Sequence, residues 1–221
     1  MNGSRTAWIS LGGIFAVLAI VAGIGGLWTG LWFNAPNEDQ TQRQNYERAI
    51  ERLEIDSTGG NITIIAGPEN RASVEQHIRW AGDSRPSAQA IWEGTTLRIV
   101  GKHCIGPREC GIDYTITVPA GVQIFAHSKG GDINVTEMAS SHADIETGNG
   151  DVRISYSDPP EQVRAVTADG DVNVVVPLGD SYTVQSQGQR GDNRVSVTED
   201  ANSGRSIVAR TGGGDVEVRY P

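Results

Sequence analysis

Apolar and polar residues alternate along most of the chain after residue 50, and six segments share one pattern. In each segment the apolar positions alternate up to a Ser or Thr. An Asp or Asn preceded by Gly follows four residues later, and the alternation then resumes. A period of two predicts β-strands with one buried face. In the third copy the pattern is carried by Ala143, Ile145, Thr147, Gly150, Asp151, Val152 and Ile154.

The Gly-Asp or Gly-Asn link in each copy predicts a turn between two strands. Glycine adopts backbone angles that other residues resist, and Asp or Asn can accept hydrogen bonds from nearby backbone N–H groups. In the fifth copy two extra residues, Gln189 and Arg190, follow Gly188 and predict a bulge or a protruding loop. The predicted turn residues are Gly60, Asn61, Gly131, Asp132, Gly150, Asp151, Gly170, Asp171, Gly191, Asp192, Gly214 and Asp215.

The copies recur about every 20 residues from the second onward, and a fixed period of about 20–50 residues is typical of solenoids and arrays. Each unit is too thin to bury its own apolar face, so stacking must supply the core. The predicted fold class is therefore all-β, a β-solenoid (β-helix-like) domain of Gly-Asp strand repeats with two short strands per coil. The alternative is an antiparallel β-sandwich in which each Gly-Asp link is a hairpin turn.

An uncharged apolar stretch precedes the repeats. No charged side chain occurs from Thr6 to Phe33, which is long enough to cross about 30 Å of hydrocarbon as a helix. It is also longer than the ~7–15-residue apolar region of a signal peptide, so we expect an uncleaved anchor. The predicted organisation is a short cytoplasmic tail (1–6), a transmembrane helix (7–33), a polar linker (34–46) and an extracytoplasmic β-repeat domain (47–221).

The orientation of this single-pass anchor follows from charge. Arg5 lies on its N-terminal side, whereas Glu38 and Asp39 open the other side. The basic side of a membrane helix stays in the cytoplasm, so the N-terminus is predicted inside and the C-terminal domain outside the cell membrane. Gly26 and Gly30 form a GxxxG pair that allows a weak homodimer, although glycine is also simply common in membrane helices.

The charge balance narrows the partners. The chain carries a formal charge of −9, and because Arg5 is the only charged residue before Glu38, the part after the helix carries −10. That sign argues against binding nucleic acid through a basic surface. It permits a cationic partner or a divalent metal. The expected partners are the membrane, through the single-pass anchor, and an envelope protein or polysaccharide.

Candidate chemistry is sparse. Cys104 and Cys110 close a short loop, and outside the cytoplasm such a pair is predicted to form a disulfide. His103 lies beside them without a full tetrahedral ligand set. Ser141, His142 and Asp144 lie within one strand, whereas triad members converge from separate segments. No catalytic residue, metal or cofactor is therefore expected.

The acidic turn residues leave one question open. The later five Asp residues would stack into a row in a solenoid, and calcium prefers carboxylate and carbonyl oxygens in loops. However, no nonapeptide calcium repeat or EF-hand loop is present. We expect each Asp to cap its own turn.

The Gly-Asp repeat, the TLRIV strand, the Cys104/Cys110 pair and the DYTITVPAGV segment together resemble the bacterial putative-adhesin domain of β-strand repeat proteins. The resemblance extends over about Ile50 to Tyr220. It implies a β-solenoid-like fold in an envelope protein and brings no catalytic residues, and some relatives are associated with envelope stress responses. The expected function is therefore a noncatalytic, membrane-anchored surface for interaction, adhesion or envelope-stress sensing. The alternative is a β-helical polysaccharide-active enzyme.

The predicted topology can be tested on intact cells. Protease added from outside should remove a tag placed after Pro221, because the domain lies outside the membrane and Arg5 lies inside. Immunoblots of cells and medium report the result. A protected tag, or a chain released into the medium, would contradict the anchored orientation.

Overall fold

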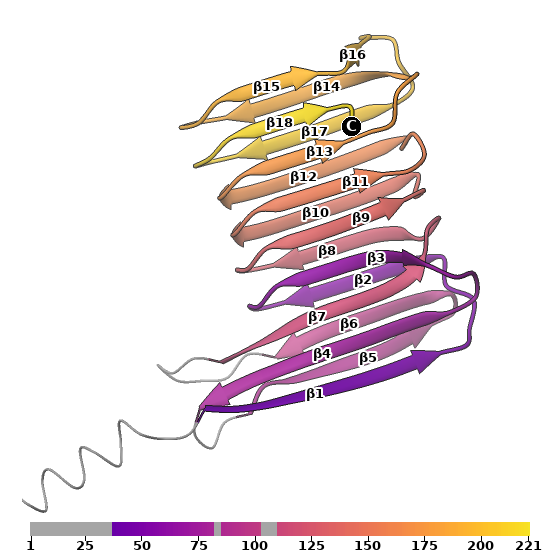
Figure 1. Cartoon of the computed structure of the whole chain (residues 1–221), viewed down its shortest axis with the longest axis vertical. Coiled ribbons are helices and arrows are strands. Elements are labelled where there is room, and N and C mark those ends of the chain that lie inside the picture. Colours follow the sequence, from indigo (N-terminus) through magenta and orange to yellow (C-terminus); the bar gives the residue numbers. More distant parts are fainter. Residues whose placement is uncertain (1–36, 82–84, 103–109) are drawn as a thin grey trace, which may run out of the picture. The chain divides into compact units, whose positions relative to one another are not determined.

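The computed structural model describes residues 37–81, 85–102 and 110–221, and its strands form two sheets of nine (Figure 1). The first sheet runs in the order β1 (Asn37–Tyr46), β4 (Ala72–Ala81), β7 (Cys110–Pro119), β3 (Ile62–Gly67), β9 (Ile133–Met138), β11 (Val152–Tyr156), β13 (Val172–Val175), β18 (Val216–Arg219) and β15 (Asn193–Ser196). The second runs in the order β16 (Thr198–Glu199), β14 (Ser181–Gly188), β17 (Ser206–Thr211), β12 (Gln162–Asp169), β10 (His142–Asn149), β8 (Gln123–Ser128), β2 (Arg52–Ser57), β6 (Thr96–Lys102) and β5 (Ser87–Glu93).

Consecutive strands of the repeat lie in opposite sheets, and equivalent strands of neighbouring coils pair in parallel. β10 pairs in parallel with β8 and β12, while β11 pairs in parallel with β9 and β13. A Gly-Asp link therefore joins the two sheets of one coil and is not a hairpin turn. The β-solenoid is confirmed, and the antiparallel sandwich is wrong for these repeats.

The order of the coils in the stack differs from their order in the sequence. The first copy, β2 and β3, lies between β6/β7 and β8/β9. The last copy, β17 and β18, lies between the fourth copy (β12/β13) and the fifth (β14/β15). Only the stretch from β8 to β13 stacks in simple chain order.

The inward positions of all coils merge into one core. In one row, Ile55, Ala126, Ile145, Ala165 and Ala209 are in register, and each is at most 1% exposed. Alanine in several coils keeps this row thin. The polar neighbours face outward, so the period-two pattern assigned the buried face correctly.

The fifth copy contains no bulge at the predicted insertion. Val184 pairs with Ile207, Ser186 with Ala209 and Gly188 with Thr211 in an unbroken register. Gly188 therefore takes the position of the Thr, and the usual four-residue spacing to Asp192 is preserved. A terminal coil faces solvent on one side, which explains why it dispenses with the buried Thr at this position.

The predicted linker is also partly wrong, because residues 37–46 form the edge strand β1 beside β4. Its polar sequence shows no alternation, since an edge strand can be held by side-chain contacts without an apolar face. The Thr41 hydroxyl lies 3.2 Å from Nδ1 of His77, and Arg43 forms an ion pair with Glu75. The compact unit begins at Glu38 rather than at residue 47.

The end of the stack that carries β1 and β5 is built differently from the repeats. β4 pairs with β7, and β5 with β6, in antiparallel register. The ring of Tyr46 meets that of Trp92 edge-on, with centroids 5.4 Å apart, and covers this end of the core. Within the described residues no helix is long and apolar enough to span a membrane, and the predicted transmembrane helix lies outside them.

Tyr114 of β7 is a large side chain at this end of the core and is 1% exposed. Burial raises the pKa of its hydroxyl to about 12, because the phenolate would lose its hydration. The hydroxyl is therefore neutral at any physiological pH.

The two faces of β13 provide a matched test of the register. Val174 is completely buried, whereas its neighbour Val175 points outward and is partly exposed. Val174→Asp should lower the free energy of unfolding by ~3–5 kcal/mol, because it buries an unpaired carboxylate. Val175→Asp should change it by less than ~0.5–1 kcal/mol. Urea unfolding of residues 38–221 measures both, and equal losses would contradict the assigned faces.

Candidate functional site

The predicted turn residues converge into one row along an edge of the solenoid. The backbone N–H of each Asp donates to Oδ1 of the equivalent residue in the neighbouring coil. The donor–acceptor pairs are Asp132–Asn61 at 3.0 Å, Asp151–Asp132 at 2.9 Å, and Asp171–Asp151, Asp215–Asp171 and Asp192–Asp215 at 2.8 Å each. All six predicted Asp or Asn residues thus belong to one continuous ladder.

The expectation that each Asp caps its own turn is therefore wrong. Parallel coils repeat every ~4.8 Å, which brings the carboxylate of one turn beneath the backbone of the next. The backbones of adjacent coils also form hydrogen bonds with each other at these turns. For example, the N–H of Val152 donates to the carbonyl oxygen of Asp171 at 2.8 Å. The row therefore joins coils to one another.

The ladder begins at a residue that the repeat pattern did not identify. Oδ1 of Asp113 in β7 accepts the N–H of Asn61 at 2.8 Å, and its Oδ2 accepts from Arg79 of β4 at 2.7 Å. The local sequence is Gly111-Ile112-Asp113, with one residue between Gly and Asp. That insertion concealed the position, although an Asp preceding an alternating strand was a usable signal.

The glycines of the same turns stack in a second row. At Gly150, which has φ of +135°, an added Cβ would lie 2.4 Å from the carbonyl oxygen of Gly131. Equivalent contacts of 2.1–2.3 Å follow at the other five predicted glycines. Glycine is therefore required because the neighbouring coil occupies the space of a side chain.

A third row lies just inside the turns. The hydroxyls of Thr147, Thr167 and Thr211 donate to glycine carbonyl oxygens of the adjacent coil at 3.0, 2.8 and 2.7 Å. Ser57 and Ser128 donate to their own turns instead. This edge of the molecule is therefore a hydrogen-bonded scaffold that joins adjacent coils.

The predicted disulfide stays a prediction. Cys110 is the first residue of β7, while Cys104 and His103 lie outside the described residues. In the described part of the chain, no three His, Cys, Asp or Glu side chains are grouped so that they could hold a metal ion.

The side chains of Ser141, His142 and Asp144 do not form a triad. Asp144 accepts from Nη1 of Arg164 at 2.8 Å, and Glu146 accepts from Nη2 of the same guanidinium at 2.8 Å. Burial lowers the pKa of Arg164, but the hydrogen bonds and charges of these two carboxylates outweigh it and raise the pKa. Asp144 is thus committed to an ion pair on the outer face of the sheet.

Charged side chains connect five strands on this outer face. Asp56 lies 3.5 Å from Arg98 and 3.8 Å from Nδ1 of His127, and Nε2 of His127 lies 4.0 Å from Asp144. Arg164 continues the chain from Asp144. These half-exposed groups hold one another in place, so this face presents charges in fixed positions.

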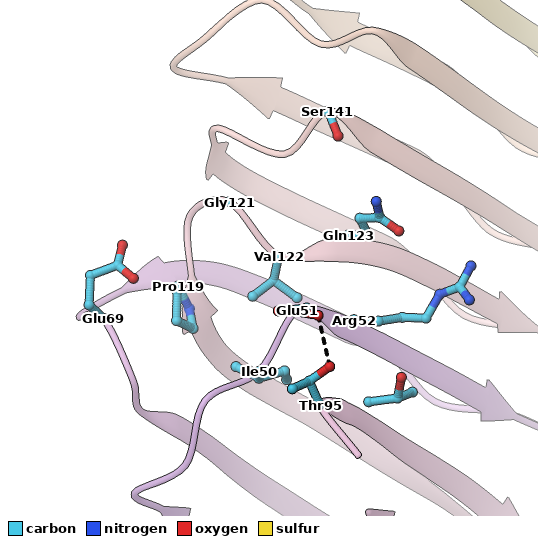
Figure 2. A pocket seen from close by; sticks show the side chains of 11 residues that line it. Ile50, Glu51, Arg52, Glu69, Thr95, Pro119, Gly121, Val122, Gln123 and Ser141 are labelled. Carbon is cyan, nitrogen blue, oxygen red and sulfur yellow. Dashed lines mark hydrogen bonds between the residues drawn. The ribbon is translucent and has the colours of Figure 1, made fainter. Parts of the chain in front are cut away.

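A pocket lies beside this face, where β2, β6, β8 and β10 begin (Figure 2). We call it the Glu51 pocket, and it has a volume of about 610 Å³. It is lined by Ile50, Glu51, Arg52, Glu69, Thr95, Thr96, Pro119, Gly121, Val122, Gln123 and Ser141.

Glu51 is positioned by contacts from two other coils. Its backbone N–H donates to the carbonyl oxygen of Thr95 at 2.9 Å, and the Thr95 hydroxyl donates to its Oε2 at 2.9 Å (Figure 2). Its own carbonyl oxygen accepts from the N–H of Gln123 at 2.9 Å. The carboxylate is therefore held in one place at the pocket wall.

The rest of the lining combines an apolar floor with polar walls. Ile50, Pro119 and Val122 are buried. Arg52 lies over the ring of Phe125, 3.9 Å from its centroid, which fixes one wall. The carboxylates of the lining accept hydrogen bonds, and its amide and hydroxyl groups can both donate and accept them. Together with the apolar floor, these groups suit a ligand with many hydroxyl groups. No sequence motif identified this pocket, because its residues come from five separate segments.

Comparisons with known proteins agree with the fold. Residues 126–220 match the family model Toastrack DUF4097. The chain is similar to a putative cell adhesion protein from Clostridium sporogenes, with a TM-score of 0.60 and 10% identity over 84% of this chain and 100% of that one. A putative adhesin from Bacteroides fragilis gives a TM-score of 0.36 and 12% identity over 81% and 97% of the two chains. No curated protein matches the sequence.

These findings confirm the resemblance to the putative-adhesin family. The family match begins at Ala126 in β8, so it covers the coils from β8 onward and not the strands before them. The similarity to the Clostridium protein at 10% identity concerns the fold alone.

Asp171 provides a test of the ladder because its side chain accepts from the N–H of Asp215. Asp171→Ala should lower the free energy of unfolding by ~1–3 kcal/mol, since it leaves that N–H without its acceptor. Asp171→Asn keeps an Oδ1 acceptor, as Asn61 does in the first copy, and should cost less than ~0.5 kcal/mol. Thermal unfolding compares the two, and equal losses would indicate that the charge matters rather than the hydrogen bond.

Proposed function

We propose that this chain, whose residues 126–220 match the Toastrack DUF4097 family model, is a noncatalytic, adhesion-type protein of the bacterial envelope. The putative cell adhesion protein that shares its fold gives the proposal its direction. The ligand would bind at the Glu51 pocket and along the adjacent outer face of β2, β8 and β10.

The observation that carries the proposal is the fixed geometry of the Glu51 pocket. Its walls come from the starts of β2, β6, β8 and β10, which the stack holds in register. A surface that is already ordered loses little conformational entropy on binding, which favours recognition. A rigid face of this kind suits a protein whose task is to hold a partner.

An envelope polysaccharide is the ligand class that fits the lining best. Sugar hydroxyls can donate to the carboxylates of Glu51 and Glu69 and can accept from Gln123 and Arg52. The buried floor of Ile50 and Val122 offers an apolar contact for a sugar ring. The negative charge of the domain favours neutral or amino sugars over acidic ones.

The apolar segment at residues 7–33 would anchor this domain to the cell membrane with the pocket outside the cytoplasm. The anchor is proposed because no charged residue occurs in this segment, and its orientation is proposed because Arg5 lies on its N-terminal side. The described domain begins only a few residues later, at Glu38.

The binding test uses residues 38–221 and fractionated envelope polysaccharides. We expect the double variant Glu51→Gln/Glu69→Gln to bind at least about tenfold more weakly, because charge-assisted hydrogen bonds contribute ~1.5–3 kcal/mol each. Glu38→Gln/Glu199→Gln removes the same charge at exposed positions that do not line the pocket and should leave the affinity unchanged. Calorimetry measures the affinities.

Two results would contradict the proposal. Equal weakening by both double variants would show that net charge, rather than the pocket, controls binding. Release of shorter saccharides during incubation would favour the polysaccharide-active enzyme instead, since such enzymes use paired carboxylates. Chromatography of the incubated polysaccharide detects that release.

A further inference from the structure

The C-terminal coil lies between two coils that precede it in the sequence. β17 pairs in parallel with β12 on one side and with β14 on the other. β18 likewise pairs with β13 and β15. The segment from β13 to β14 therefore passes over the place of a whole coil, about two strand spacings or ~9.6 Å (Figure 1).

Without residues 206–221 this place would be a gap with hydrogen-bonding groups on both walls. On one wall, the N–H of Val172 donates to the carbonyl oxygen of Asp215, and Oδ1 of Asp171 accepts the N–H of Asp215, each at 2.8 Å. On the other wall, the N–H of Asp192 donates to Oδ1 of Asp215, and the carbonyl oxygen of Asp192 accepts from the N–H of Val216, each at 2.8 Å.

The gap is also apolar inside. Ile207, Ala209 and Val218 of the inserted coil have no exposed surface, and Val216 is 1% exposed. On the β12/β13 side their partners are the buried residues Val163, Ala165, Val172 and Val174. On the β14/β15 side, Val184 and Val195 alternate with the polar Ser186 and Asn193. Filling the gap therefore buries apolar area chiefly against β12 and β13.

Hydrogen bonds of two residues, Arg205 and Tyr220, distinguish this coil from the other Gly-Asp coils. Before β17, Arg205 donates to Oδ1 of Asp180 at 3.1 Å and to the carbonyl oxygen of Pro159 at 3.0 Å. After β18, the Tyr220 hydroxyl donates to the carbonyl oxygen of Asp180 at 3.0 Å and accepts from the N–H of Thr198 at 2.9 Å. Asp180 lies in the connection that spans the gap, so these contacts close the gap around residues 205–220.

We propose that the gap is a binding site for a strand–turn–strand segment, and that residues 205–221 of a second copy of this chain fill it as well as the chain's own. A swapped copy keeps every contact just described, and only the connection at residues 200–204 changes its course. That connection is mostly exposed, with Asp200, Ala201, Asn202 and Gly204 on the surface. The partner class is thus a second copy that exchanges its last coil.

Cutting the connection tests the site directly. A protease site placed between Ala201 and Asn202 of the full chain allows the coil to be cut from the rest. After unfolding and refolding with excess labelled peptide of residues 202–221, we expect the label to be incorporated in proportion to the peptide present. The same peptide with Gly214→Ala should fail, because its Cβ would lie 2.2 Å from the carbonyl oxygen of Gly170.

A second measurement identifies the partner. Two full-length copies with different N-terminal tags are refolded together or separately over a range of concentrations. We expect co-purification to rise with concentration in the jointly refolded sample, and to be absent when separately refolded samples are mixed and analysed at once. Mixing after refolding controls for association through other surfaces, including the predicted membrane helix.

The two experiments are interpreted for a cut chain that, after refolding, unfolds at the same temperature as the uncut chain. No incorporation of the labelled peptide overturns the binding site. Incorporation of the peptide without co-purification at any concentration overturns the second copy as partner. Equal co-purification from joint and separate refolding overturns coil exchange and indicates another contact surface.

Discussion

The structure depends on one repeated contact, in which the backbone N–H of a turn residue donates to the side-chain oxygen of the turn in the next coil. From Asp113 through Asn61 to Asp192, this contact runs through seven coils without a break. It satisfies a backbone donor at each turn where the chain leaves one sheet for the other. It also requires the coils to approach so closely that only glycine fits beside it.

That constraint explains where this molecule can carry function. The turn edge is occupied by the ladder, and the interior is filled by inward side chains. Variation is therefore left to the outward positions and to the opposite ends of the strands, where the Glu51 pocket lies. Because the ladder fixes the register, each outward residue has defined neighbours on the adjacent strands. His127, for example, lies opposite Asp56 of β2 and Glu146 of β10.

The sequence predicted the local features that repeat and missed those that depend on where a coil is placed. Alternation located the buried face of every copy, and the Gly-Asp pairs located the turns, because both are set within a few residues. The edge strand β1 was missed because its contacts with His77 and Glu75 are made by polar side chains from a distant segment. The Glu51 pocket was invisible for the same reason, since residues as far apart as Ile50 and Ser141 line it.

The order of the coils has a consequence for stability. In an ordinary solenoid each repeat contacts only its neighbours in sequence, so the ends can fray independently. Here β2 pairs with both β6 and β8, and β17 with both β12 and β14. Opening the stack at these pairs separates strands that are far apart in the chain. The conformational entropy of closing the loops between them was already lost when the domain folded. Interleaving therefore couples the N-terminal strands and the last coil to the middle of the stack, and we expect the outer face between them to unfold with the whole domain.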